Sequence, residues 1–360
     1  MLASLLGIVE SGVLFVFTYF ARHLLIAIIP ACFLTGALQV FLPSRVVTRY
    51  LKRPHRAISS WTVAAVSGTL LTVSSKQVVP LFADVRKGGV SLGPSMVLLF
   101  AGPALNILTL ALTVRILGWD YALARFAGAF CFSLVIGLGM VLIWRKREVP
   151  AKIFRPVKHR GFLKSFSWRR YLLFGLLSCV LIFSLLQPRF ERMISAKGGL
   201  DTLISLLPVS FFILGTITAA LLCIRCSMGN WLGETWLIIR TMCIRLIAGV
   251  FIAGVFREVV PYAWIEALVG GEGIIPNLFA AIFGSFIHFA TLTEVPITSV
   301  LLEMGMGKGP ALTFLLSGPA LSLSNLIAIR KVAGSSRTLT YMMLVIAATT
   351  MAGLVYGLVV

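Results

Sequence analysis

The sequence predicts an all-α polytopic membrane protein made of two homologous repeats in inverted orientation, with re-entrant or broken helices at Gly/Pro motifs. Three observations favour this fold class. The 360 residues are 59% hydrophobic and only 12% charged, about half the charged share of a soluble domain. Apolar runs of membrane-spanning length recur from end to end. The chain also matches itself at a shift of 216 residues, which carries Gly102 onto Gly318. A soluble core cannot absorb this much apolar surface, so a soluble enzyme is excluded.

The first repeat is assigned to residues 1–144, which precede the most basic stretch of the chain. Its apolar runs cover about 11–42, 60–83, 91–115 and 119–144. The following stretch, 145–170, holds ten Lys or Arg residues and one Glu. Basic loops are retained on the cytoplasmic side, so 145–170 is predicted to be a cytoplasmic loop that divides the two halves.

The remainder of the chain continues the pattern. Residues 171–227 are predicted to form two linking transmembrane helices, and residues 228–360 form the second repeat. The apolar runs cover about 171–187, 202–224, 235–257, 275–300, 309–329 and 338–360. Together these runs predict a multi-pass protein of the cell (inner) membrane.

The charge balance is strongly basic, with 32 Lys and Arg against 12 Asp and Glu and a net charge of +20. In a membrane protein this excess is expected on cytoplasmic loops beside anionic lipid. These loops contain no recognition module, so no nucleic-acid partner is expected. A lone CxxC, Cys223 and Cys226, has no second Cys or His pair near it, so neither a metal site nor a cofactor is expected.

The self-match consists mainly of residues that shape the backbone. Shared apolar composition would instead produce matches of Leu, Ile and Val. The helix breaks are assigned to Pro80, Gly102 and Pro103 in the first half and to Pro296, Gly318 and Pro319 in the second. Broken helices free backbone groups that, in lipid, need protein or a water-lined cavity as partner. Interruptions at corresponding places in two halves are typical of a secondary-transporter core.

Equivalent loops of the two halves carry opposite charge. The loop 43–58 has five Lys or Arg and no acid, whereas 258–273 has three Glu and no Lys or Arg. The positive-inside rule places the first loop in the cytoplasm and the second outside. The repeats are then inverted if about 60–88 and 275–304 are re-entrant hairpins. The alternative is that every segment spans the membrane and the repeats are parallel.

Two charged residues lie in corresponding breaks of the halves. Lys76 has apolar flanks, and Glu294 lies two residues after Leu292, the partner of Lys76 in the self-match. A charge at bilayer depth costs about 2.5–3.5 kcal/mol on insertion scales, so such residues face a cavity or pair with one another. We expect Lys76 and Glu294 to approach each other or to share a solute. The alternatives are a snorkelling Lys76 or a static structural pair.

Polar residues around the same breaks complete the candidate solute site. The predicted substrate-binding residues are Ser74, Ser75, Lys76, Gln77, Asn106, Thr291, Thr293, Glu294 and Asn325. Their hydroxyls and amides can equally serve unsatisfied backbone groups. Glu294 is the first candidate for proton coupling and His288 the second, because acids and histidines inside a membrane form proton relays. Coupling through Glu294 predicts a pH-dependent flux that Glu294→Gln flattens.

A family resemblance is carried by three stretches: VVPLFADVRKGGVSLGPSMVLLFAGPALNIL, EVPITSVLLEMGMGKGPALTFLLSGPALSLSNL, and NWLGETWLII from Asn230. They resemble the predicted-permease family of YraQ-like and ArsP-like proteins, the latter being organoarsenical efflux permeases. The resemblance covers about 10–145 and 228–358 and implies a permease. Family members often show Cys-Ser-Cys where this chain has Ser74-Ser75-Lys76. Thiolates suit a trivalent arsenical and a lysine suits an anion, so an anionic or zwitterionic solute is expected.

These features favour a secondary transporter rather than an enzyme, working by alternating access at a midplane site between the repeats. The chain has no Walker-type nucleotide motif, so it hydrolyses no nucleotide itself. One alternative is a non-transporting scaffold or the permease subunit of a larger complex. Another is an integral-membrane lipid enzyme, although the four His are widely separated and no HExxH occurs. The expected partners are a small-molecule solute and membrane lipids, with a homo-oligomer or partner subunit also open.

Overall fold

The computed structural model describes residues 2–23, 28–41, 51, 57–71, 75–145, 168–195, 215, 228–287 and 292–360. The regular elements of these residues are helices, and no β-strand occurs among them. The predicted all-α fold class is therefore confirmed. The predicted span at 202–224 lies outside the described residues apart from Gly215, as do most of the loops 43–58 and 145–170.

The described helices fall before and after the basic loop. Before the basic loop they are α1 (Leu2–His23), α2 (Ile29–Phe41), α4 (Ala57–Leu71), α5 (Ser75–Lys87), α6 (Leu92–Ala104), α7 (Ile107–Ile116) and α8 (Trp119–Trp144). After it they are α9 (Trp168–Ser195), α11 (Met228–Val259), α12 (Tyr262–Val269), α13 (Ile274–Ile287), α14 (Glu294–Glu303), α15 (Lys308–Leu321), α16 (Leu323–Ala333) and α17 (Ser335–Val359).

Three of the described helices are long and apolar enough to cross a membrane: Trp119–Trp144, Gly229–Val259 and Ser335–Val359. Three further spans are added if each pair of helices joined by a sharp bend is counted as one. The bends are 43° between α6 and α7, 50° between α15 and α16, and 115° between α12 and α13. Broken apolar helices, as predicted, are therefore part of the fold.

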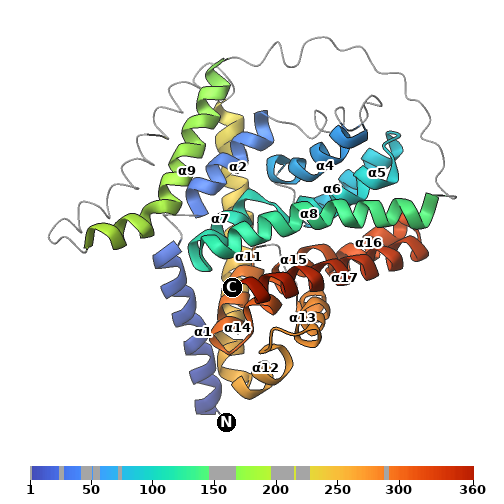
Figure 1. The fold of residues 1–360 in the computed structure, drawn as a ribbon. Coiled ribbons are helices and arrows are strands. Elements are labelled where there is room, and N and C mark those ends of the chain that lie inside the picture. Colours follow the sequence, from blue (N-terminus) through green and yellow to red (C-terminus); the bar gives the residue numbers. More distant parts are fainter. Residues whose placement is uncertain are drawn as a thin grey trace.

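The helices form a central group and a flanking group (Figure 1). In the central group α8 packs along α17, and α6 packs against α15. Helices that precede the basic loop in the sequence therefore meet helices that follow it in the middle of this group. The flanking group is built on α11, which contacts both α1 and α2, while α9 packs on α2. The first and last thirds of the chain thus share one helical bundle.

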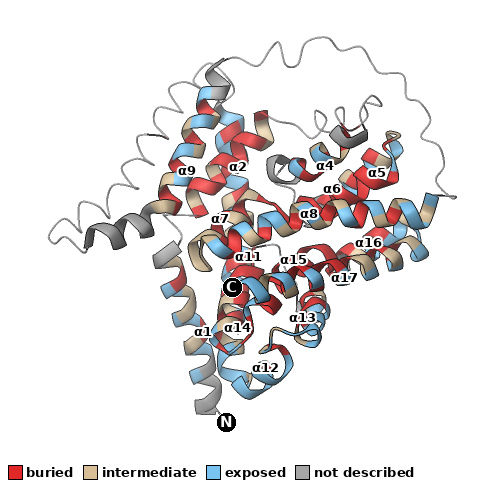
Figure 2. Ribbon diagram, in the orientation of Figure 1, coloured by how far each residue is buried: buried red, intermediate tan, exposed pale blue. Residues whose placement is uncertain are grey.

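The helices that carry the repeated GPAL motif, Gly102–Leu105 and Gly318–Leu321, lie deepest in the bundle. Every residue of α6 is buried, and so is every residue of α15 from Gly309 onward. A helix that is apolar all round belongs in the interior. Large apolar side chains are instead exposed on outer faces, such as Leu142 on α8, Phe286 on α13 and Leu358 on α17 (Figure 2). Lipid is the solvent that such faces require.

Glycines allow the buried helices to approach their neighbours closely. A Cβ atom on Gly309 of α15 would lie 2.5 Å from the carbonyl oxygen of Gly353 on α17. A Cβ atom on Gly137 of α8 would lie 3.1 Å from the carbonyl oxygen of Gly93 on α6. Both helix crossings therefore require a glycine at the point of contact, as is common where membrane helices pack.

Some predicted boundaries are corrected by the structure. Within the predicted run 11–42 the structure describes α1 and α2, and residues 24–27 between them lie outside the described residues. Pro80 and Pro296 do not break their helices, because α5 and α14 begin before them and continue past them. Pro296 is the third residue of α14, where the missing N–H has no intrahelical acceptor in any case. α5 begins at Ser75, and α14 begins at Glu294 after the turn residues Leu292 and Thr293.

Candidate functional site

The site is built on the break between α6 and α7. Asn106 is the N-cap of α7, and its side-chain Oδ1 accepts a hydrogen bond from the backbone N–H of Leu108 at 3.0 Å. In an unbroken helix that N–H would serve the carbonyl of Ala104. The break thus diverts a donor to Asn106 and frees the Ala104 carbonyl inside the bundle. A freed carbonyl at this depth requires another donor.

Arg125 of α8 supplies that donor. Its Nε donates to the Ala104 carbonyl oxygen at 3.1 Å, and its Nη1 donates to Thr113 Oγ1 at 3.3 Å. The residue is fully buried, with a relative exposure of 0%. The Thr113 hydroxyl in turn donates to the carbonyl of Thr109 at 2.7 Å. The guanidinium is therefore held by both helices of the broken pair.

The third contact of Arg125 is an ion pair with Glu294. Arg125 Nη2 donates to Glu294 Oε1, and the two side chains are 0% and 1% exposed. Glu294 is the first residue of α14, where a carboxylate is favoured by the helix dipole. The pair joins α8 to α14 across 169 residues of sequence. Removal of one partner from a buried ion pair costs about 3–5 kcal/mol, because the other charge is left uncompensated.

The surroundings of this pair are tightly packed. The cavity that Leu108, Leu112 and Leu292 line with two other apolar residues has a volume of about 10 Å³. That volume is close to a single water probe and holds no organic solute. Thr293 is buried next to Glu294, and its side chain packs against Gly249 of α11. Both side chains of the ion pair are enclosed by protein, with no more than 1% of either exposed.

At the break between α15 and α16 a buried asparagine also forms a hydrogen bond with the backbone. Asn325 is buried in α16, and its Nδ2 donates to the carbonyl oxygen of Pro319 at 3.2 Å. α15 ends at Leu321, two residues after that proline. Pro103 likewise precedes the end of α6 by one residue. Both breaks therefore fall just after the predicted Gly-Pro pairs Gly102-Pro103 and Gly318-Pro319, and a buried asparagine bonds backbone at each.

The structure gathers only part of the predicted site. Glu294 pairs with Arg125, and Asn106 caps the helix α7 that Arg125 also bonds, whereas Asn325 serves the other break. The backbones of Ser75, Lys76 and Gln77 form the first turn of α5, but their side chains lie outside the described residues, as do Ser74, His288 and Thr291 entirely. The described partner of Glu294 is Arg125, whereas the predicted approach of Lys76 to Glu294 involves a side chain outside the described residues. No group of three His, Cys, Asp or Glu in the described ranges could hold a metal ion.

Arg125 is the functional candidate that sequence reasoning missed. It lies in the apolar run 119–144, within ALARFAGAF, as a single cation several residues from either end. A cation at such a depth is a site candidate by default, and the reasoning that selected Lys76 would have selected Arg125 too. Its pairing with Glu294, however, depends on how α8 and α14 meet in space.

An all-α bundle of apolar helices, with broken pairs at its centre and a buried ion pair at one break, defines a multi-pass membrane protein of the transport class. The chain belongs to the family described as "predicted permease", whose profile matches residues 11–358. The predicted family resemblance is thereby confirmed.

Two relatives illustrate the match. The UPF0718 protein MJ0584 of Methanocaldococcus jannaschii is 32% identical over 365 residues, which cover 99% of this chain and 98% of that protein. The UPF0718 protein YraQ of Escherichia coli is 23% identical over 308 residues, covering 83% of this chain and 67% of that protein. The chain is similar to the first of these over nearly its whole length.

Proposed function

We propose that this permease is a secondary transporter of the cell (inner) membrane that moves a small anionic or zwitterionic solute by alternating access at a midplane site between two repeats. The observation that carries the proposal is the buried pair of Arg125 and Glu294 at the α6–α7 break. Arg125 is a cation that already binds a carboxylate in a site without water access. A carboxylate or phosphate group of a solute has the same chemistry as the Glu294 side chain.

If Glu294 and an anionic solute bind Arg125 in turn, the movement of a proton is coupled to the movement of the solute. When Glu294 takes a proton, the carboxyl loses its charge and Arg125 is left without a counter-ion. An anionic solute then restores neutrality by binding Arg125. The net charge of the site is zero before and after, so neither state leaves an unpaired charge in lipid. Proton and anion therefore bind together, and deprotonation of Glu294 expels the anion.

We infer that the fold is built of two repeats, and this inference supports a site of this kind. When α6, α7 and α8 are shifted by 216 residues, their first residues fall on the first residues of α15, α16 and α17. The glycines with positive φ follow the same shift. Gly89 (φ 87°) pairs with Gly305 (φ 96°), and Gly118 (φ 97°) pairs with Gly334 (φ 88°).

The contacts between the halves support the same relationship. α5 contacts α16, and the corresponding helices α14 and α7 contact each other. Arg86 and Lys87 at the end of α5 correspond to Leu302 and Glu303 at the end of α14. This reversal of charge favours inverted over parallel repeats under the positive-inside rule. In the proposed arrangement Ser74, Ser75, Lys76, Gln77 and Thr291 belong to the turns that face the same solute path.

Ligand-induced stabilisation of the purified chain tests the proposal. The panel comprises phosphate, sulfate, acetate, glycine, a trivalent arsenical and Zn²⁺, and the readout is the unfolding temperature in detergent. A ligand at 100 times its Kd adds about 2.7 kcal/mol to the stability of the folded state. We expect an anion or zwitterion to stabilise the wild type and Glu294→Gln, and not Arg125→Gln/Glu294→Gln. Stabilisation that survives in the double variant would place the solute elsewhere, and a response to the arsenical or Zn²⁺ alone would overturn the solute class.

A further inference from the structure

A second charged site lies far from Arg125, at the ends of α5 and α16 and the start of α17. A cavity of about 510 Å³ opens there. Its lining residues are Phe82, Ala83, Arg86, Lys87, Leu92, Lys331, Val332, Ala333 and Arg337. Cavities of this size hold organic ligands rather than single ions. None of these residues contacts the Arg125 and Glu294 pair in the interactions described above.

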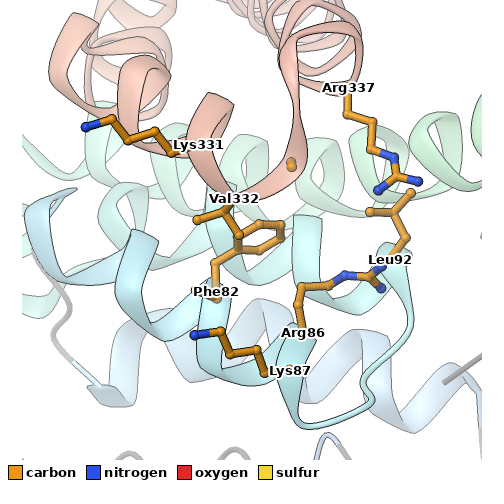
Figure 3. A pocket seen from close by; sticks show the side chains of 9 residues that line it. Phe82, Arg86, Lys87, Leu92, Lys331, Val332 and Arg337 are labelled. Carbon is orange, nitrogen blue, oxygen red and sulfur yellow. The ribbon is translucent and has the colours of Figure 1, made fainter. Parts of the chain in front are cut away.

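The charge of the cavity has one sign. Arg86, Lys87, Lys331 and Arg337 are cations, and no carboxylate occurs among the described residues that line it. Figure 3 shows the two lysine side chains to one side of Phe82 and Val332, and the two arginine side chains to the other. Like charges at a helix–helix contact repel each other, and an anion between them removes that cost.

The two guanidinium groups are held in place by their neighbours. Arg86 Nη1 donates to the carbonyl oxygen of Val90 at 3.0 Å, within the turn that joins α5 to α6. The guanidinium of Arg337 lies over the ring of Trp144, 5.4 Å from its centroid. Such contacts position a guanidinium before a ligand arrives, which lowers the entropy that binding costs. The site is therefore organised in the absence of a ligand.

We propose that this cavity binds a phosphate-bearing organic anion. A phosphate group offers up to two negative charges and several acceptor oxygens, which match a pair of neighbouring cations better than the single charge of a carboxylate does. The apolar wall of Phe82, Leu92 and Val332 suits the organic part of the ligand. Two sources share this chemistry: the headgroup of an anionic phospholipid and a soluble organic phosphate. Either one bridges α5 to α16 and α17, so its binding stabilises the contact between the two halves of the chain.

Thermal unfolding of the delipidated full chain in neutral detergent tests the proposal with two pairs of probes. Glycerol phosphate is compared with glycerate, and short-chain phosphatidylglycerol is compared with phosphatidylcholine. The test variant is Lys87→Gln/Lys331→Gln, since both lysines are exposed and their loss does not disturb packing. The matched control is Arg330→Gln, which removes a neighbouring cation that bonds Ser335 and does not line the cavity.

We expect one phosphate probe to raise the unfolding temperature of the wild type, and its apparent affinity to fall by about tenfold or more in the lysine variant. Arg330→Gln and Arg125→Gln/Glu294→Gln should bind as the wild type does. A response to phosphatidylglycerol alone identifies a lipid as the source, and a response to glycerol phosphate identifies a soluble one. Equal stabilisation by glycerate, or by phosphatidylcholine, overturns the proposal, and so does a response that the lysine variant keeps. If the double variant does not fold, Lys331→Gln alone gives the same test.

Discussion

Arg125 on α8 and Glu294 on α14 are paired inside the bundle with no more than 1% of either side chain exposed. The same guanidinium bonds the Ala104 carbonyl that the α6–α7 break leaves without its helical donor. The Arg125 side chain therefore bonds both the broken helix pair α6–α7 and the buried carboxylate of Glu294. Any event that separates the pair must also change how the halves contact each other.

The first prediction concerns the energy of this pair. Arg125→Gln and Glu294→Gln should each lower the free energy of unfolding by about 3–5 kcal/mol, because each leaves an unpaired buried charge. The double variant should recover most of that loss, since it buries no charge. The measurement is denaturant unfolding of the four proteins of this double-mutant cycle.

An exposed ion pair provides the matched control for the cycle. Arg257 and Glu303 lie 3.3 Å apart, with side chains 45% and 52% exposed. Arg257→Gln and Glu303→Gln should each change the free energy of unfolding by about 1 kcal/mol or less. Additive losses in the Arg125 and Glu294 cycle would show that the two residues do not depend on each other.

The second prediction concerns the glycine crossing of α15 and α17. Gly353→Ala should destabilise the protein by about 1–3 kcal/mol, because the crossing has no space for a methyl group. The added Cβ would lie 2.6 Å from the Gly309 carbonyl oxygen. Gly233→Ala is the control, since a Cβ there meets nothing within 4 Å. Equal unfolding temperatures for the two variants would contradict the close approach of these helices.

The third prediction concerns the orientation of the repeats. Thr48→Cys and Gly271→Cys, each in a chain whose native cysteines are replaced by Ser, probe the basic loop and its acidic counterpart. An impermeant thiol reagent applied to intact cells should label Gly271→Cys directly and Thr48→Cys only after permeabilisation. This is the result that opposite loop charge predicts for inverted repeats. Equal labelling of the two positions would indicate parallel repeats.

Much of the fold follows from apolar periodicity and Gly/Pro placement. The run 119–144 coincides with α8, and the breaks fall just after Pro103 and Pro319. The breaks could be predicted because Gly and Pro act on the local backbone. The run 60–83 contains α4 as far as Leu71 and α5 from Ser75 onward, and the residues between them lie outside the described part of the chain.

The pairing of Glu294 with Arg125 could not be predicted in the same way. Sequence symmetry selected Lys76, which occupies the corresponding break of the other half. The pair with Arg125 arises because α8 passes the start of α14, a relationship of tertiary structure that spans 169 residues. Long-range pairing of this kind leaves no periodic signal in the sequence. Only the cost of a lone cation in lipid pointed to Arg125 as a residue in need of a partner.

The most direct test of the central claim is the number of protons taken up when an anion binds the purified protein. Calorimetry of the same anion in buffers of different ionisation enthalpy measures this number. If an anion replaces the Glu294 carboxylate on Arg125, the wild type and His288→Gln should each take up one proton for every anion bound. Glu294→Gln should bind the anion with no proton uptake. Anion binding without proton uptake in the wild type, or uptake that persists in Glu294→Gln, would contradict the account.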